Sequence, residues 1–144
     1  MRLVVDTSVL VGELLRASGR DRIGDNRLEL FLPEQMWDET KVEIPRRVRT
    51  LARRCGLDAA IADDLVARCL HAIDANVVIL EEGVYAAVED EARARSCRDP
   101  GDWPVVASAL VLTAGIWTND NDFLGTGVAT WTTESLAAWL ERHA

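Results

Sequence analysis

The chain has 144 residues, of which 49% are hydrophobic, so it has the size and composition of one domain spanning residues 1–144. Its net charge of −8 argues against binding to nucleic acid through overall positive charge. Three cysteines and two histidines without paired spacing argue against a disulfide scaffold and a Cys/His zinc site.

Short apolar strands alternate with helices along the chain. Strands are predicted at residues 3–5, 28–32, 76–80, 116–118 and 128–131. Helices are predicted at residues 8–17, 33–55, 57–72, 84–95, 102–114 and 133–141, with a polar turn-rich stretch at 19–26. Strands that alternate with helices indicate a mostly parallel sheet covered on both faces.

Proline and glycine residues mark the breaks in this pattern. We expect the helix that begins after Pro33 to kink or split at Pro45, because proline lacks a backbone donor and clashes one turn back. The segment Gly125–Gly127 is predicted as a turn rather than a phosphate-binding loop, because it leads into a strand and not into a helix.

Nothing in the sequence indicates a membrane segment. Asp6 interrupts the first apolar run almost at once, so a signal peptide is not expected. The longest apolar stretch, residues 105–117, is shorter than the ~20 residues that a membrane-spanning helix needs. We therefore expect a cytoplasmic protein with no membrane partner.

Carboxylates stand at four places where a parallel sheet would bring strand ends together. Asp6 follows the first predicted strand, Asp120 and Asp122 follow the fourth, and Glu39 and Asp102 lie in the first turns of helices. Ligands of parallel sheets bind at the carboxyl ends of the strands. Because carboxylates gathered there repel one another, the pattern predicts a divalent cation as counter-ion.

Each acid also has a simpler explanation when it is taken alone. Asp6 and Asp102 suit the N-cap position of a helix. Asp120 and Asp122 suit a turn, and Glu39 suits a solvated helix face. Independent caps and turns have no reason to converge, so the set as a whole favours a metal site.

Four segments, in this order, resemble the PIN-domain nucleases, which include VapC-type toxins. They are residues 3–10, 33–39, 102–110 and 115–123, and the last ends in Thr118-Asn119-Asp120-Asn121-Asp122-Phe123. The resemblance implies a three-layer α/β/α sandwich with a mostly parallel five-stranded sheet, a Mg²⁺ or Mn²⁺ site and a homodimer. The toxins of this family imply a small antitoxin protein as a further partner.

The function predicted on these grounds is metal-dependent hydrolysis of phosphodiester bonds in single-stranded or structured RNA. Asp6, Asp102 and Asp120 are assigned as metal ligands, and Asp122 supports the site from its rim. Glu39 positions the attacking water or a second ion, and Ser8 and Thr118 are expected to donate hydrogen bonds to the ligands.

A basic segment lies within this acidic chain. Residues 41–54 carry six basic side chains and one acidic side chain. We expect RNA phosphates to bind four of the basic side chains, Arg46, Arg47, Arg49 and Arg53. A solvated helix face or a docking surface for an acidic partner explains them equally well. The alternative function is a PIN-like RNA- or protein-binding module that has lost catalysis.

Overall fold

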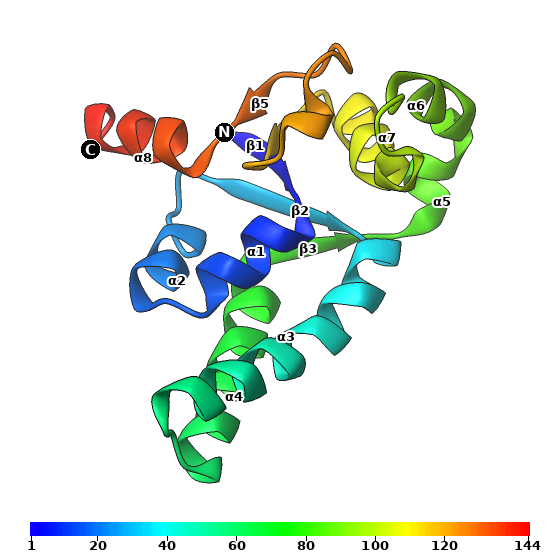
Figure 1. Ribbon diagram of the computed structural model, residues 1–144. Helices are drawn as coiled ribbons and strands as arrows, with labels where there is room; N and C mark the ends of the chain where they lie inside the picture. The colour runs from blue at the N-terminus through cyan, green and yellow to red at the C-terminus, as the bar shows by residue number, and fades with distance from the viewer.

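The computed structural model describes residues 1–144 and contains one five-stranded sheet (Figure 1). Its strands are β1 (Arg2–Val5), β2 (Glu29–Pro33), β3 (Val77–Leu80), β4 (Gly115–Trp117) and β5 (Thr130–Trp131). They run in the order β3-β2-β1-β4-β5, and every neighbouring pair is parallel. The predicted parallel sheet is confirmed, and it is parallel throughout.

Helices cover both faces of this sheet (Figure 1). They are α1 (Thr7–Leu14), α2 (Ala17–Ile23), α3 (Glu34–Cys55), α4 (Ala59–Asn76), α5 (Glu82–Tyr85), α6 (Glu89–Arg95), α7 (Trp103–Leu112) and α8 (Thr133–Arg142). Three short 3₁₀ helices are η1 (Ala86–Val88), η2 (Pro100–Asp102) and η3 (Asn121–Phe123). None of the helices has both the length and the apolar character that spanning a bilayer requires.

The path of the chain explains the layers. From β1 to β2 to β3 the chain moves in one direction across the sheet, and α1 to α4 cover one face. It then crosses back from β3 to β4, and α7, with α6 against it, packs on β1, β2 and β4. Because crossovers between parallel strands are right-handed, this reversal places α7 on the opposite face. The predicted three-layer sandwich is confirmed.

The reversal also creates the crevice where a ligand would bind. β1 lies between β2 and β4, and Val5 is in register with Trp117. The carboxyl ends of β1 and β4 therefore lie side by side where the strand order reverses, which is the usual ligand position in such sheets. The core beneath them is fully closed: Leu3, Val4 and Val5 are all 0% exposed.

Of the kink or split predicted at Pro45, the split is wrong, because α3 runs through the proline as one helix of 22 residues. Ile44 and Val48, on either side of the proline, are both buried in the core. Packing of the two halves on the same core keeps them in one helix despite the lost backbone hydrogen bond. The helix ends at Gly56, as predicted, in the left-handed conformation that glycine favours (φ +66°).

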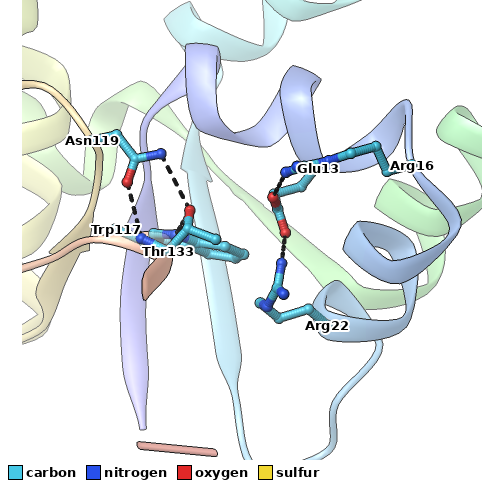
Figure 2. Close-up of polar contacts among 6 residues, drawn as sticks. All are labelled: Glu13, Arg16, Arg22, Trp117, Asn119 and Thr133. Atoms are coloured by element: carbon cyan, nitrogen blue, oxygen red, sulfur yellow. Dashed lines mark hydrogen bonds and ion pairs between the residues drawn. The ribbon is translucent and has the colours of Figure 1, made fainter. Parts of the chain in front are cut away.

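The predicted turn at residues 19–26 is also wrong, because α2 occupies most of it. The buried carboxylate of Glu13 on α1 pairs with Arg16 and with Arg22 on α2 (Figure 2). Gly19 lets the helices approach, since a Cβ there would lie 2.0 Å from the backbone oxygen of Glu13. Contacts between distant residues thus stabilise a helix that local composition does not indicate.

The predicted helix at residues 84–95 is divided into α5, η1 and α6. Tyr85 is completely buried, and its ring packs against Trp103 of α7 at 5.7 Å between centroids. Ala92 of α6 is also completely buried. The break in the helix lets both side chains reach α7, so tertiary packing overrides the local helical pattern.

The segment Gly125–Gly127 is a turn, as predicted. Both glycines have positive φ, at 87° and 79°. The hydroxyl of Thr126 donates to the carbonyl of Phe123 at 2.9 Å, and the carbonyl of Thr126 accepts from Arg95 at 2.8 Å. These contacts tie the segment to the body of the domain.

Candidate metal-dependent active site

Asp6 stands at the end of β1, where the sheet geometry holds it rigidly. Its backbone N–H donates to the carbonyl of Trp117 at 3.0 Å, which continues the pairing of β1 with β4. One carboxylate oxygen, Oδ2, accepts hydrogen bonds from Ser8 Oγ at 3.1 Å and from Thr118 Oγ1 at 2.9 Å. The two hydroxyls assigned as supporting donors therefore bind the same oxygen.

Thr118 connects Asp6 to the second strand-end acid. Its side chain is 2% exposed, and its hydroxyl accepts from the backbone N–H of Asp120 at 3.0 Å while it donates to Asp6. A hydroxyl has one hydrogen to donate and lone pairs to accept, so both bonds form together. The carboxylate of Asp6 is thereby linked to the backbone that carries Asp120.

Asn119, the residue before Asp120, is held against Thr133 at the start of α8 (Figure 2). The side-chain amide of Asn119 accepts from the backbone N–H of Thr133 at 2.9 Å and donates to its hydroxyl at 3.3 Å. The same hydroxyl accepts from Trp117 Nε1 at 3.1 Å. Sequence reasoning gave Asn119 no role, because this contact depends on where α8 begins in space.

For the RNA hydrolysis predicted from the sequence, replacing Asn119 with alanine is expected to lower kcat by about tenfold and to leave the fold intact, because groups that orient a predicted metal ligand contribute at this level. The reason is the loss of both bonds that hold the Asp120 loop to α8. Steady-state RNA cleavage checks the effect, and circular dichroism checks the fold. Thr133→Ser is the matched control, because serine keeps the hydroxyl that Asn119 contacts. If the Asn119→Ala chain cleaves RNA as fast as the parent, Asn119 does not help to position Asp120.

Asp102 ends η2 and precedes α7. The pKa of its carboxyl is raised to about 7, first by burial and then by the negative charges of Asp99, Asp6, Asp120 and Asp122. Burial also raises the pKa of Asp6, against the lowering effect of its hydrogen bonds. Asp99 is a residue that sequence reasoning missed; its position in a predicted turn gave no sign of its closeness to Asp102.

Neither Asp6 nor Asp102 acts as a helix cap. Both occupy an N-cap position, yet neither side chain makes a capping hydrogen bond. Asp58, the N-cap of α4, does accept one, from the backbone N–H of Ile61 at 2.9 Å. Helix capping therefore does not explain why Asp6 and Asp102 stand at these positions. It holds in part for Asp120, whose Oδ1 accepts from the N–H of Asp122 at 2.9 Å in a turn.

Two adjoining pockets are lined by the predicted site acids other than Asp102, which lines neither of them. Asp6, Glu39 and Asp120 line the first, with Ser8 and Arg47. Ser8 and Asp120 also line the second, together with Asp122 and Arg98. Glu39 is presented by α3 and therefore joins two strand-end acids from a distant part of the chain.

The four acids assigned to catalysis have no basic partner. The salt bridges of the chain involve none of Asp6, Glu39, Asp102 and Asp120. Asp122 pairs with Arg98 at 3.4 Å. No three of the acidic side chains lie close enough together to form a ready cation site.

The arginines of the basic segment divide between two surfaces. Arg47 lines the acidic pocket beside Glu43. Arg46, Arg49 and Arg53 line a separate pocket between α3 and α4 that also contains Asp58 and Asp63. Residues 49–68 include no buried residue, and this end of the α3–α4 hairpin extends away from the sheet (Figure 1).

Comparison with known families agrees with this architecture. The profile of the PIN domain matches residues 4–141. The chain belongs to the PIN-domain family. Members of this family are generally nucleases that depend on divalent metal ions. No curated protein matches the sequence.

Solved structures of low identity share the PIN fold. PAE2754 from Pyrobaculum aerophilum is 20% identical, with a TM-score of 0.65 over 99% of this chain and 90% of that one. FitAB bound to an IR36 DNA fragment is 20% identical, with a TM-score of 0.57 over 92% and 94%. FitAcB from Neisseria gonorrhoeae is 19% identical, with a TM-score of 0.57 over 91% and 96%.

The donor set of this PIN domain suits a hard divalent cation. All the acidic groups offer oxygen, which Mg²⁺ and Mn²⁺ prefer. The carboxylates of Asp6 and Asp102 are partly desolvated, have no basic partner and make no capping bond. The hydroxyl of Thr7, which also lines the acidic pocket, is buried without any hydrogen-bond partner. These oxygen groups, none of them neutralised by a basic side chain, fit a bound cation and its waters.

Proposed function

We propose that this PIN domain is a Mg²⁺- or Mn²⁺-dependent endoribonuclease. One observation carries the proposal: Asp6 and Asp102 are partly buried carboxylates that neither cap their helices nor pair with a basic side chain. Keeping such charges at the junction of β1 and β4 is unfavourable unless they bind a cation. The acidic composition of the pocket and the nuclease family support the same reaction.

The proposed roles follow from the positions of the side chains. Asp6, Asp102 and Asp120 would hold the ion, with Asp122 at the rim. The ion would supply Lewis-acid chemistry there, helping a water to ionise and offsetting charge that develops on a phosphodiester. Ser8 and Thr118 keep one oxygen of Asp6 fixed, which leaves the other oxygen free.

Glu39 is the proposed acceptor for the proton of the attacking water. It is exposed at the wall of the pocket and has no basic partner, so its carboxylate is open to water. The water attacks phosphorus in line with the leaving 3′-oxygen, and that oxygen departs with a proton taken from solvent. Arg47, on the same wall, is placed to contact a phosphate of the substrate.

The direct test is cleavage of labelled single-stranded RNA by the purified chain with Mn²⁺, and with Mn²⁺ plus a chelator. We expect cleavage only with free metal. Asp120→Asn, purified in the same way, is the control for contaminating nuclease. Binding of RNA with no metal-dependent cleavage would instead support the alternative, a catalytically inactive PIN-like binding module.

Partners and location are further proposals on the same basis. The VapC-type toxins of this family support a role as the toxin of a toxin–antitoxin pair in the cytoplasm, with a small antitoxin protein. Growth arrest on expression, relieved by a short neighbouring reading frame, tests that role. Light scattering of the purified chain tests the proposed homodimer.

A further inference from the structure

The second pocket over the acids has one basic side chain, Arg98, which comes from the segment between α6 and η2. This arginine lies outside the basic segment of residues 41–54 and across the pockets from it. Because the two pockets adjoin at Ser8 and Asp120, Arg98 at one end and Arg47 at the other flank the acids. Resting on the proposed function, we propose that Arg98 is a positioning residue that binds a phosphate of the RNA next to the cleaved bond.

The contacts of Arg98 leave most of its hydrogen-bonding capacity free. Its Nε lies 3.4 Å from Asp122 Oδ1, and its Nη1 lies 3.4 Å from the carbonyl of Asn121. Charge-assisted bonds of this kind are usually about 2.7–2.9 Å long. A guanidinium has five N–H donors, and 61% of this side chain is exposed. The guanidinium is therefore held near the acids but not saturated.

The two arginines of the preceding helix α6, Arg93 and Arg95, are committed to structural contacts. Arg95 donates to the carbonyl of Thr126 at 2.8 Å and pairs with Glu91 at 2.9 Å. Arg93 pairs with Glu89 at 2.8 Å and lies over the ring of Trp103 at 5.1 Å. These bonds are short and fix the side chains to the fold. Arg98, with only long contacts, is the arginine of this region that can change partner.

The chemistry of the substrate requires such a group. RNA brings negative phosphates into a pocket lined by several carboxylates, in a chain of net charge −8. One metal site neutralises charge only at its own position, so the neighbouring phosphates need another cation. Arg98 supplies it by exchanging Asp122 for a phosphate oxygen, and guanidinium binds phosphate through two parallel N–H bonds.

If Arg98 exchanges Asp122 for a phosphate, substitutions of Arg98 and of Asp122 have opposite effects on RNA affinity. Binding is measured by fluorescence anisotropy with a short oligouridine in chelator, so the readout does not depend on cleavage. Arg98→Ala is expected to weaken binding about tenfold, and to reduce the salt dependence of log K by about 0.7, the value for one phosphate contact to a single strand. Asp122→Asn is expected to tighten binding, and most of that gain is lost in the double variant with Arg98→Ala.

Two controls separate this contact from a general charge effect. Arg68→Ala removes an arginine of similar exposure, 64%, that pairs with Asp64 on α4 and lines neither pocket over the acids. It is expected to bind RNA like the parent. Arg98→Lys keeps one positive charge and is expected to recover part of the affinity. Equal binding by the parent and Arg98→Ala, or equal losses in Arg98→Ala and Arg68→Ala, overturns the proposal.

Cleavage with Mn²⁺ distinguishes this proposal from the proposed function. Arg98→Ala is expected to raise KM about tenfold with little change in kcat, because the contact forms in both the ground state and the transition state. A chain that never cleaves RNA but loses affinity in Arg98→Ala contradicts the nuclease and supports the phosphate contact. If the parent and Arg98→Ala both cleave RNA with the same KM, the phosphate contact of Arg98 is contradicted and the proposed nuclease activity is supported.

Discussion

Asp102→Asn is expected to abolish cleavage and, at the same time, to stabilise the metal-free protein. Removing one group that stabilises charge in a transition state lowers rates by about 10²–10³-fold, and loss of a metal ligand has at least that effect. The stabilisation arises because the pKa of Asp102 is raised to about 7 by burial and by four neighbouring carboxylates. Its charged form is therefore unfavourable in the folded chain.

The pH dependence of this stabilisation has a defined sign. The unfolded chain loses the proton near the ordinary pKa of 3.8, whereas the folded chain keeps it up to about 7. Protonation of Asp102 thus favours folding, and the metal-free parent loses stability as pH rises from about 4 to 7. Asparagine cannot ionise, so the gain should be present at pH 8 and absent at pH 4.

Thermal melting in chelator measures this effect. Since the carboxyl is half-exposed, solvent screening reduces the gain to about 1–2 kcal/mol, or roughly 5 °C in Tm. Asp58→Asn is the matched control, because asparagine caps a helix as well as aspartate and α4 lies away from the acids. A lower melting temperature for Asp102→Asn than for the parent at pH 8 would show that the ionised carboxylate of Asp102 does not destabilise the folded chain.

The positions of the strand-end acids could be predicted from the sequence because they follow from the topology of the sheet. Asp6 and Asp120 follow short apolar strands, and adjacent parallel strands necessarily end at the same edge of a sheet. Glu39 could be placed near them because α3 begins directly after β2, the other neighbour of β1. These positions depend only on the order of strands and helices, which hydrophobic periodicity reveals.

The residues that were missed depend on side-chain positions between segments far apart in the chain. Asn119 matters through Thr133 on α8, and Arg98 through Asp122 on η3. The helix α2 was missed for the same reason, since its ion pair with Glu13 and its close approach at Gly19 are tertiary contacts (Figure 2). Periodicity and composition describe single segments, so they contain no information about such pairs.

The affinity for Mn²⁺ is expected to fall steeply below pH 7. A metal ligand must give up its proton to bind, and Asp102 retains its proton up to about pH 7 in the folded chain. Competition with one proton of this pKa weakens binding by about 25-fold between pH 7.5 and pH 5.5. Ordinary surface carboxylates, which ionise near pH 4, would show almost no change over this range.

Asp99→Asn provides the sharpest check of this pH dependence. Asp99 is the charged neighbour that raises the pKa of Asp102 most, after burial. Asparagine keeps the oxygen that accepts from the N–H of Gly101 at 3.0 Å, so the turn is preserved while the charge is removed. The midpoint of the Mn²⁺-binding profile, measured by calorimetry at several pH values, should therefore move to lower pH. A flat profile for the parent would show that no proton on Asp102 competes with the ion. A sloping profile that Asp99→Asn leaves in place would show that the competing proton resides on another group.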